Sequence, residues 1–154
     1  PTSMRPYRLR KKVLAGADFI QTQLVYDVAA FREYMKKVVD LGAAEQTRIL
    51  AGVGPLKSPG MARHLRDNVP GVTAPDALVK RMEAAARGID ESDKEGRRNA
   101  WAAEGQKICV ELIQQLREVP GVAGVHIMAI EWEQAVRPIV EAAGLLPRPV
   151  VDGA

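Results

Sequence analysis

The stretch Gly16-Ala17-Asp18-Phe19-Ile20-Gln21-Thr22-Gln23-Leu24-Val25-Tyr26-Asp27 decides the fold. It predicts the end of a helix, a short buried strand from Phe19 to about Leu24, and a turn into a new helix capped by Asp27. Because side chains alternate along a strand, Gln21 and Gln23 share one face. A buried amide without a partner costs about 1 to 3 kcal/mol. The two amides are therefore expected to form hydrogen bonds with each other, with loop backbone or with a ligand.

Two later apolar runs predict further strands, one from Arg48 to about Val53 and one over Gly124–Ile130. The first continues into Gly54-Pro55, and its glycines would let the backbone approach a ligand closely. The second carries His126, a lone histidine in an apolar strand, which predicts a satisfied core residue. Helical patterns fill the intervals between the strands. The order helix, strand, helix, strand, helices, strand, helix predicts parallel βα units.

Capping residues mark the predicted helix starts. Ser58-Pro59 opens one helix, and Ser92-x-x-Glu95 is interpreted as a capping box that begins the longest helix, which runs to about Glu118. Gly105 lies in the middle of that long helix, where glycine costs about 1 kcal/mol relative to alanine. Close packing of the helix on a strand is the expected compensation.

Length and composition limit the function classes. The 154 residues predict one domain, residues 1–154, with flexible ends at 1–4 and 147–154. The single cysteine, Cys109, and the lack of any Cys/His cluster with metal-ligand spacing predict no metal site and a reducing, cytoplasmic setting. No apolar run approaches the roughly 20 residues of a membrane span, so no membrane partner is expected. The net charge of +3 is mild and compatible with anionic ligands.

The segment Arg5–Lys12 places five cations in eight residues. On a helix, Arg8 and Lys12 are four residues apart and share a face, from which they could reach one phosphate or diphosphate. The charge run alone favours the alternative, a solvated basic face. The run lacks the interleaved aromatic residues or motif of a nucleic-acid arm, so no nucleic-acid partner is expected.

Three segments carry a resemblance to a known family. Gly-Ala-Asp-Phe-Ile-x-Thr-Gln-Leu-x-Tyr-Asp at 16–27 resembles the sixth-strand signature of the methylenetetrahydrofolate reductases, which are flavoenzymes built on a (β/α)8 barrel. Ala-Gly-Val-Gly-Pro-Leu at 51–56 and Gly-Val-His-Ile-Met at 124–128 are similar to later segments of that family, in the same order. The resemblance implies an α/β fold of about three βα units, the C-terminal portion of a (β/α)8 TIM barrel. A barrel needs eight strands, so this chain alone would not close one.

The same resemblance implies an oxidoreductase of one-carbon metabolism and methionine biosynthesis. The family reduces 5,10-methylenetetrahydrofolate to 5-methyltetrahydrofolate, with NADH or NADPH as hydride donor and a flavin as cofactor, here FAD in preference to FMN. Gln23 matches a residue that hydrogen-bonds the pterin, and Leu65 matches one that packs against folate and nicotinamide. Lys12 and Arg8 match positions that hold the flavin phosphates, although some relatives have asparagine at the latter. The family's general acid belongs to the first half of the barrel, so no catalytic residue is expected here.

Departures from the family pattern leave alternatives open. Met61 stands where some relatives have a substrate-contacting glutamine, and Glu131-Trp132 stands where relatives often have Asn-Arg. The expected partners are the folate substrate and the remaining barrel segment or another subunit, with a homo-oligomer left open; the isolated chain could be an inactive fragment. One alternative is a noncatalytic half-barrel binding or assembly module whose exposed sheet edge pairs with another subunit. The other is a nucleic-acid binder that uses Arg5–Lys12.

Overall fold

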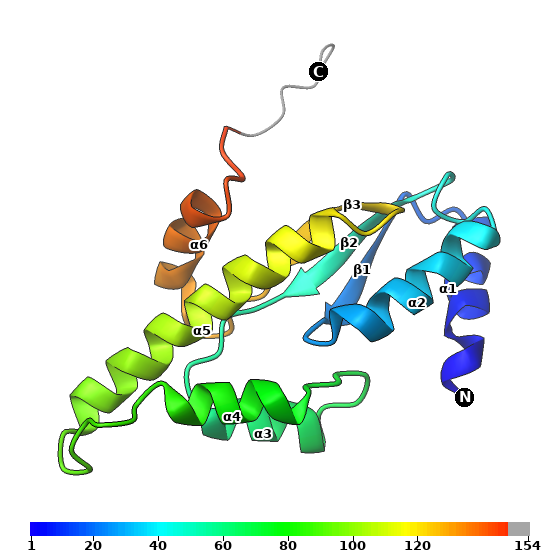
Figure 1. Cartoon of the computed structure of the whole chain (residues 1–154). Coiled ribbons are helices and arrows are strands. Elements are labelled where there is room, and N and C mark those ends of the chain that lie inside the picture. Colours follow the sequence, from blue (N-terminus) through cyan, green and yellow to red (C-terminus); the bar gives the residue numbers. More distant parts are fainter. Residues whose placement is uncertain (148–154) are drawn as a thin grey trace.

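The computed structural model describes residues 1–147. Its elements are η1 (Thr2–Met4), α1 (Arg5–Leu14), β1 (Phe19–Leu24), α2 (Val28–Asp40), β2 (Arg48–Val53), α3 (Pro59–Asn68), α4 (Asp76–Ala84), α5 (Lys94–Arg117), β3 (Val122–Ile127), η2 (Glu133–Ala135) and α6 (Val136–Ala142). The strands form a parallel sheet in the order β1-β2-β3 (Figure 1). The predicted alternation of parallel βα units is therefore confirmed, and the fold is α/β.

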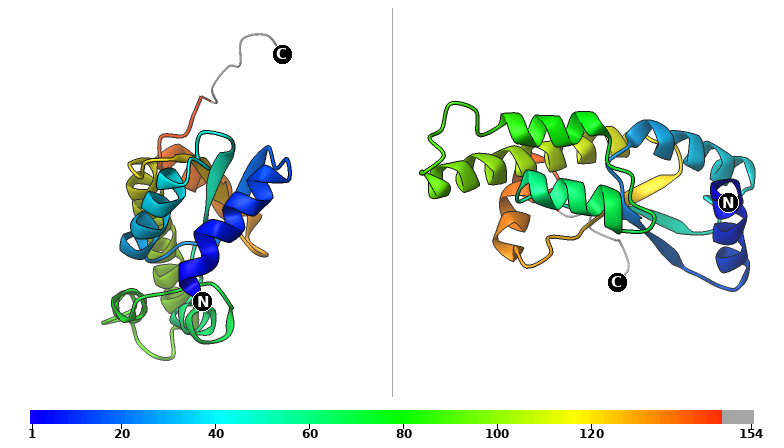
Figure 2. Two further views of the ribbon diagram at one scale, coloured as in Figure 1. Left: turned by 90° about the vertical axis from the view of Figure 1, so that its right-hand side faces the viewer. Right: turned by 90° about the horizontal axis from the view of Figure 1, so that it is seen from below.

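The core lies between the sheet and the two helices α2 and α5, which cover one side of it (Figure 2). Ile49, Ala51 and Val53 alternate along β2 and are 0% exposed. They share one buried cluster with Met35 of α2 and Leu116 of α5, which are also 0% exposed. Full burial of an aliphatic side chain stabilises the fold by about 1.5 to 3 kcal/mol. The helix-facing side of the sheet is thus the main source of stability.

β1 has the predicted bounds but is not a buried strand. Among residues 1–147 it pairs only with β2, which makes it an edge strand. Phe19, Gln21 and Gln23 are exposed, whereas Leu24 on the opposite face is buried. Because both amides reach solvent, the cost of burying an unpaired amide does not arise. The sequence pattern identified the strand but not its position at the edge of the sheet.

β2 matches its predicted bounds, whereas the predicted third strand was wrong at both ends. The third strand, β3, extends over Val122–Ile127 and not over 124–130. Its last ladder pair joins Ile127 to Val53, the final residue of β2. After one further backbone bond, from the Met128 N–H to the Val53 carbonyl at 2.7 Å, the chain turns away. The apolar run continues beyond this point, but β2 offers it no more partners.

Two predicted helix caps are confirmed and one is wrong. Asp27 and Ser58 each accept a hydrogen bond from a backbone N–H three residues on, at 2.9 and 3.1 Å. The cap of α5 is Asp93, which accepts the corresponding bond at 2.8 Å. Ser92 instead donates its backbone N–H and its hydroxyl to Asp90, at 2.8 and 2.6 Å. The aspartate before Ser92 therefore removes it from the predicted capping box.

Gly105 allows close packing, as predicted, but against a loop. A Cβ at this position would lie 1.7 Å from the carbonyl oxygen of Leu56 and 2.7 Å from its carbonyl carbon. Leu56 follows the end of β2 at Val53, so the partner is the strand exit and not the strand. α5 has 24 residues and extends well beyond the sheet (Figure 1), which brings its middle over this exit.

The chain ends, the helices and the charged side chains were compared with the sequence predictions. The segment 1–4, predicted to be a flexible end, contains the 3-10 turn η1, and most of the other predicted flexible end, 147–154, lies outside the described residues. None of the helices described here is both long and apolar enough to cross a membrane. Residues 1–147 contain no group of three or more His, Cys, Asp or Glu side chains arranged to hold a metal ion.

Candidate functional site

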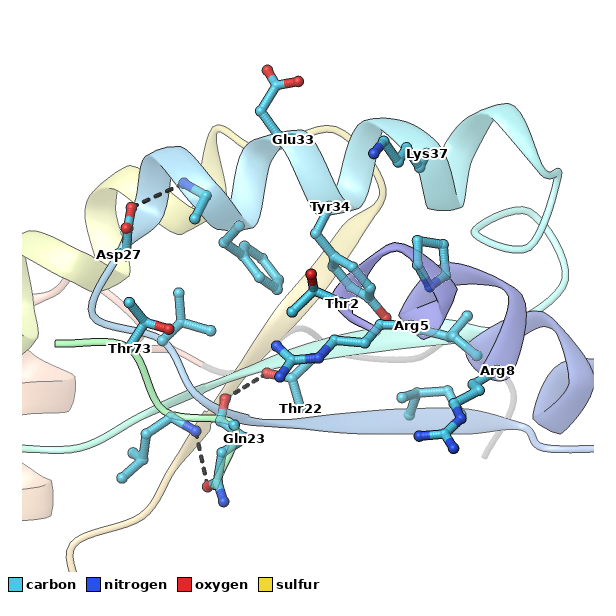
Figure 3. Close-up of a pocket in the computed structure, with 18 of the residues that line it drawn as sticks. Thr2, Arg5, Arg8, Thr22, Gln23, Asp27, Glu33, Tyr34, Lys37 and Thr73 are labelled. Atoms are coloured by element: carbon cyan, nitrogen blue, oxygen red, sulfur yellow. Dashed lines mark hydrogen bonds between the residues drawn. The ribbon is translucent and has the colours of Figure 1, made fainter. Parts of the chain in front are cut away.

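A groove of about 720 Å³ lies between α1, β1 and α2 (Figure 3). Its floor is β1, and the loop after α3 closes one end. The residues that line it include Arg5, Arg8, Leu9, Lys12, Gln23, Tyr34, Lys37 and Thr73. Three of the four predicted site residues, Arg8, Lys12 and Gln23, therefore line one groove, although Figure 3 shows the Gln23 amide on the opposite side of β1 from Arg5 and Tyr34.

The fourth predicted residue, Leu65, lies elsewhere. It is on α3, is 5% exposed and belongs to the buried core. It does not line the groove. The structure thus places the two predicted phosphate contacts in one groove, the predicted pterin contact on the strand that forms its floor, and the predicted apolar contact elsewhere.

The amphipathic sequence of α1 directs its cations toward the groove. Leu9 and Val13 are 5% and 7% exposed and join the core, while Arg8 and Lys12 remain exposed. In a helix, residues three and four apart lie on one side. Arg5, Arg8 and Lys12 follow this spacing and form one basic row along the cavity.

The cations of the groove are not neutralised by carboxylates. Within residues 1–147, every ion pair involves an arginine of α3, α4 or α6, namely Arg63, Arg66, Arg81 or Arg137. Arg5, Arg8, Lys12 and Lys37 take part in none of them. Of the acids that line the cavity, Asp27 caps α2, and Figure 3 shows the Glu33 carboxylate pointing away from Gln23 and Arg5. The groove is therefore suited to an anionic ligand.

Gln23 presents free hydrogen-bonding capacity at the end of β1. Its Oε1 accepts a bond from the Leu24 N–H at 3.1 Å, but its amide nitrogen has no partner among the described residues. The pairing register of β1 shifts between Gln21 and Leu24, where the Thr22 hydroxyl accepts the Gly52 N–H at 2.9 Å. Gly71 lies close by, since a Cβ there would be 3.8 Å from the Gln23 Cγ. Figure 3 shows this amide on the opposite side of β1 from Arg5 and Tyr34, so its nitrogen can donate to a ligand on that side of the strand.

Arg5 and Tyr34 connect the two helical walls. In Figure 3 the Arg5 side chain lies between Tyr34 and Thr22. Burial raises the pKa of Tyr34, and the positive charge of Arg5 acts in the opposite direction. The phenol therefore stays neutral near neutral pH and can donate or accept a hydrogen bond.

The glycines at the end of β2 allow close packing within the protein. The sequence interpretation, that they let the backbone approach a ligand closely, was wrong. A Cβ at Gly52 would lie 2.6 Å from the Met128 Cε, and one at Gly54 would lie 2.7 Å from the Met128 carbonyl oxygen. The space beside both residues is already filled by protein. Small residues are needed here because β1, β2 and the segment after β3 converge.

The residues near β3 lie apart from the groove. His126 is not a satisfied core residue, because its Nδ1 is buried without a hydrogen-bond partner and the side chain is partly exposed. It lines a smaller cavity, of about 330 Å³, beside α6. Glu131 has a φ of 52°, and its carbonyl accepts the Lys57 ammonium at 2.9 Å. Neither Glu131 nor Glu133 lines the groove.

Sequence reasoning missed several lining residues. The sequence could have indicated Arg5, because this residue precedes Arg8 by one helical turn within the basic segment. No sequence pattern indicates Tyr34 and Lys37, because they line the groove only as a result of how α2 packs beside α1. Thr73 likewise reaches the groove only through the path of the loop after α3.

Comparisons with known proteins identify the family of this chain. Residues 3–144 match the family model described as Methylenetetrahydrofolate reductase. Methylenetetrahydrofolate reductase 2 of Schizosaccharomyces pombe is 30% identical over 144 residues, which are 91% of this chain and 21% of the relative. Methylenetetrahydrofolate reductase 1 of the same organism is 31% identical over 148 residues, 94% of this chain and 22% of the relative. The chain spans about a fifth of the length of these curated relatives. It belongs to the methylenetetrahydrofolate reductase family.

Proposed function

We propose that this chain supplies the C-terminal half of the site of an enzyme that reduces 5,10-methylenetetrahydrofolate to 5-methyltetrahydrofolate. NADH or NADPH is the hydride donor, and a flavin, FAD in preference to FMN, is the cofactor. The observation that carries the proposal is that Arg8 and Lys12 line one groove, with Gln23 on the strand that forms its floor, in a chain that belongs to this family. When bound, the flavin supplies the redox chemistry between nicotinamide and folate.

The charges of the groove fit the proposed flavin phosphates. Arg8 and Lys12 are exposed, lie one turn apart on α1 and form no ion pair within residues 1–147. A phosphate group can therefore bind them without displacing a carboxylate. Charge-assisted hydrogen bonds of this kind are about twice as strong as neutral ones.

Gln23 fits the proposed recognition of the pterin. An amide donates and accepts, which matches the adjacent donors and acceptors of a pterin ring. The amide nitrogen is available, while Oε1 is engaged by the Leu24 N–H. Leu65 belongs to the proposal through the resemblance alone, as a residue that packs against folate. Its 5% exposure restricts that contact to a small part of the side chain.

The proposed barrel requires a further polypeptide segment at β1. The outer edge of this strand is unpaired within the described residues, and three large apolar side chains of α1 and β1, Tyr7, Leu14 and Phe19, are 51%, 66% and 56% exposed. Unpaired strand edges and exposed large apolar side chains are typical of surfaces that another segment covers. The partner is the remaining barrel segment or another subunit, including a second copy of this chain. The same features favour the second candidate function, a noncatalytic half-barrel assembly module.

The visible absorption spectrum of the protein, purified without denaturant and supplied with FAD, tests the proposal. We expect a bound-flavin spectrum, reduction by NADH or NADPH, and reoxidation by methylenetetrahydrofolate. Lys12→Gln is expected to lose flavin, whereas Lys11→Gln is the matched control, because Lys11 is exposed on the same helix and does not line the groove. A colourless protein that fails to bind added flavin would overturn the proposal and favour the assembly module.

A second variant tests the role of Gln23. Gln23→Ala is expected to weaken folate binding about tenfold, the effect of losing a hydrogen bond of about 1.4 kcal/mol, with little change in flavin content. Flavin content comes from the absorption spectrum and folate binding from titration of the reduced protein. Equal loss of flavin and folate would argue against this assignment.

A further inference from the structure

The side chain of Lys57 links the loops that follow β2 and β3. Lys57 lies just after β2, and its ammonium donates to the carbonyl oxygen of Glu131, just after β3, at 2.9 Å. Lys57 is partly exposed and forms no ion pair within residues 1–147, so its partner is a backbone carbonyl and not a carboxylate. The contact joins two loops at the carboxyl ends of adjacent parallel strands. The proposed function assigns a role to neither residue.

Glu131 lies in a tight turn and has a strained backbone. The turn runs from Ala129 to Trp132 and is closed by a hydrogen bond from the Trp132 N–H to the Ala129 carbonyl at 3.0 Å. The φ of Glu131 is 52°, the only positive value for a residue other than glycine within residues 1–147. A residue with a Cβ keeps such a conformation only where surrounding contacts hold it, and residues of this kind cluster at functional sites. The bond from Lys57 is one of these contacts.

We infer that Lys57 is a positioning residue, which holds this turn at the edge of the substrate site that contains Gln23. The inference rests on the proposed function, because that function places folate at Gln23. Lys57 acts through the turn and needs no contact with a ligand of its own.

The backbone that carries Lys57 is fixed on both sides. Leu56 is 0% exposed, and Ser58 caps α3. Earlier in the same loop, the Gly54 carbonyl accepts the hydroxyl of Tyr26, a buried residue just after β1, at 3.1 Å. The ends of β1, β2 and β3 are therefore connected in turn by two side chains, Tyr26 and Lys57. A side chain on such a fixed segment can hold a neighbouring loop in place.

The turn held by Lys57 lies close to Gln23. Met128 immediately precedes the turn, and a Cβ at Gly52 would lie 2.6 Å from the Met128 Cε and 2.8 Å from the Gln23 carbonyl oxygen. The two residues thus flank the same point of β2. Because binding groups must be held within about 0.5 Å of their productive geometry, a displaced turn is expected to weaken substrate binding beside it.

Amide hydrogen exchange, followed by NMR on the ligand-free protein, tests whether Lys57 holds the turn. Lys57→Met removes the ammonium and is expected to raise the exchange rate of the Trp132 N–H about fivefold, the upper range for an exposed charged contact. The Met128 N–H, which bonds to the Val53 carbonyl at 2.7 Å, is expected to keep its rate. Lys57→Arg retains a donor for the carbonyl and is expected to restore the wild-type rate. Lys80→Met is the matched control, because it removes the same charge from an exposed position on α4.

A folate titration separates a positioning role from a merely structural one. The Kd of 5-methyltetrahydrofolate is measured with the reduced, flavin-loaded protein, and Lys57→Met is expected to raise it about fivefold. Flavin content is expected to stay at the wild-type value, because Lys57 does not line the groove. Lys57→Arg is expected to restore the wild-type Kd, and Lys80→Met to leave it unchanged. Circular dichroism spectra confirm that each variant is folded.

Two results would overturn the inference. An unchanged exchange rate of the Trp132 N–H in Lys57→Met would mean that the turn does not depend on Lys57. Faster exchange with an unchanged Kd would mean that Lys57 stabilises the turn without positioning the substrate site. Failure of the proposed function gives a different result, because the wild-type protein itself would then bind neither flavin nor folate, whereas failure of the inference leaves wild-type binding intact.

Discussion

Replacing Gly105 with alanine is expected to destabilise the protein by about 2 kcal/mol. The new Cβ would lie 1.7 Å from the Leu56 carbonyl oxygen, whereas real Cβ contacts are essentially never shorter than 3.0 Å. α5 and the exit of β2 must therefore separate by at least about 1.3 Å, the difference between these two distances. Overpacking of this kind costs about 1 to 3 kcal/mol. Because the obstructing atom is backbone and cannot rotate away, we expect a cost near the top of that range, offset by about 1 kcal/mol of gained helix propensity.

Urea unfolding followed by far-UV circular dichroism measures this change. Gly60→Ala is the matched control, because Gly60 is also helical and its new Cβ would have only the Ser58 Oγ nearby, at an ordinary 3.6 Å. That control is expected to be neutral or stabilising by a few tenths of a kcal/mol. If Gly105→Ala were as stable as the wild type, with an unchanged slope m, the close approach of α5 to Leu56 would be refuted.

Three further predictions concern a cap, a thiol and an ion pair. Asp27→Ala removes the side-chain acceptor at the start of α2 and is expected to lower the free energy of unfolding by about 1 kcal/mol, measured in urea; an effect as small as that of an exposed substitution would contradict the cap. Burial raises the pKa of the Cys109 thiol to about 12, so a thiol reagent near neutral pH should label it only after unfolding, and rapid labelling of the native protein would contradict this burial. The hydrogen bond from Arg81 lowers the pKa of Glu111 below its usual 4.5. The stabilisation by this pair is therefore complete above that pH and is lost as the pH falls through the lower folded-state value. Glu111→Gln should reduce the fall in urea midpoint between about pH 6 and pH 3, and an unchanged fall would assign it to other groups.

The sequence predicted the elements whose ends are determined by neighbouring residues in the chain. The first two strands are compact runs bounded by turn residues, and their predicted ends agree with the structure. The third strand failed because its apolar run outlasts its hydrogen-bonding partner, β2. The cap of α5 failed because Asp90 competes for Ser92, a contact that a capping-box pattern does not include. In both cases a neighbouring group decided the outcome.

Some residues of the candidate site were likewise predicted from local patterns, whereas others depend on tertiary packing. Arg8 and Lys12 follow from helical spacing, and Gln23 from the alternation of a strand. The groove that these residues line is formed by the packing of α1 beside α2, which no local pattern encodes. Lys37 depends on that packing entirely. The buried position of Leu65 also follows from tertiary packing, since helical periodicity does not distinguish a core contact from a ligand contact.

The exposed edge of β1 has a consequence for handling the protein in solution. Over residues 1–147 the outer backbone groups of β1 have no strand partner, and such an edge can recruit a strand from a neighbouring molecule, which leads to aggregation. The basic row of α1 lies beside this edge and repels an identical molecule that approaches it. The Debye length falls from about 8 Å near physiological ionic strength to about 3 Å in 1 M salt, so added salt removes this repulsion. We therefore expect solubility to be highest in dilute buffer and to decrease as the salt concentration rises.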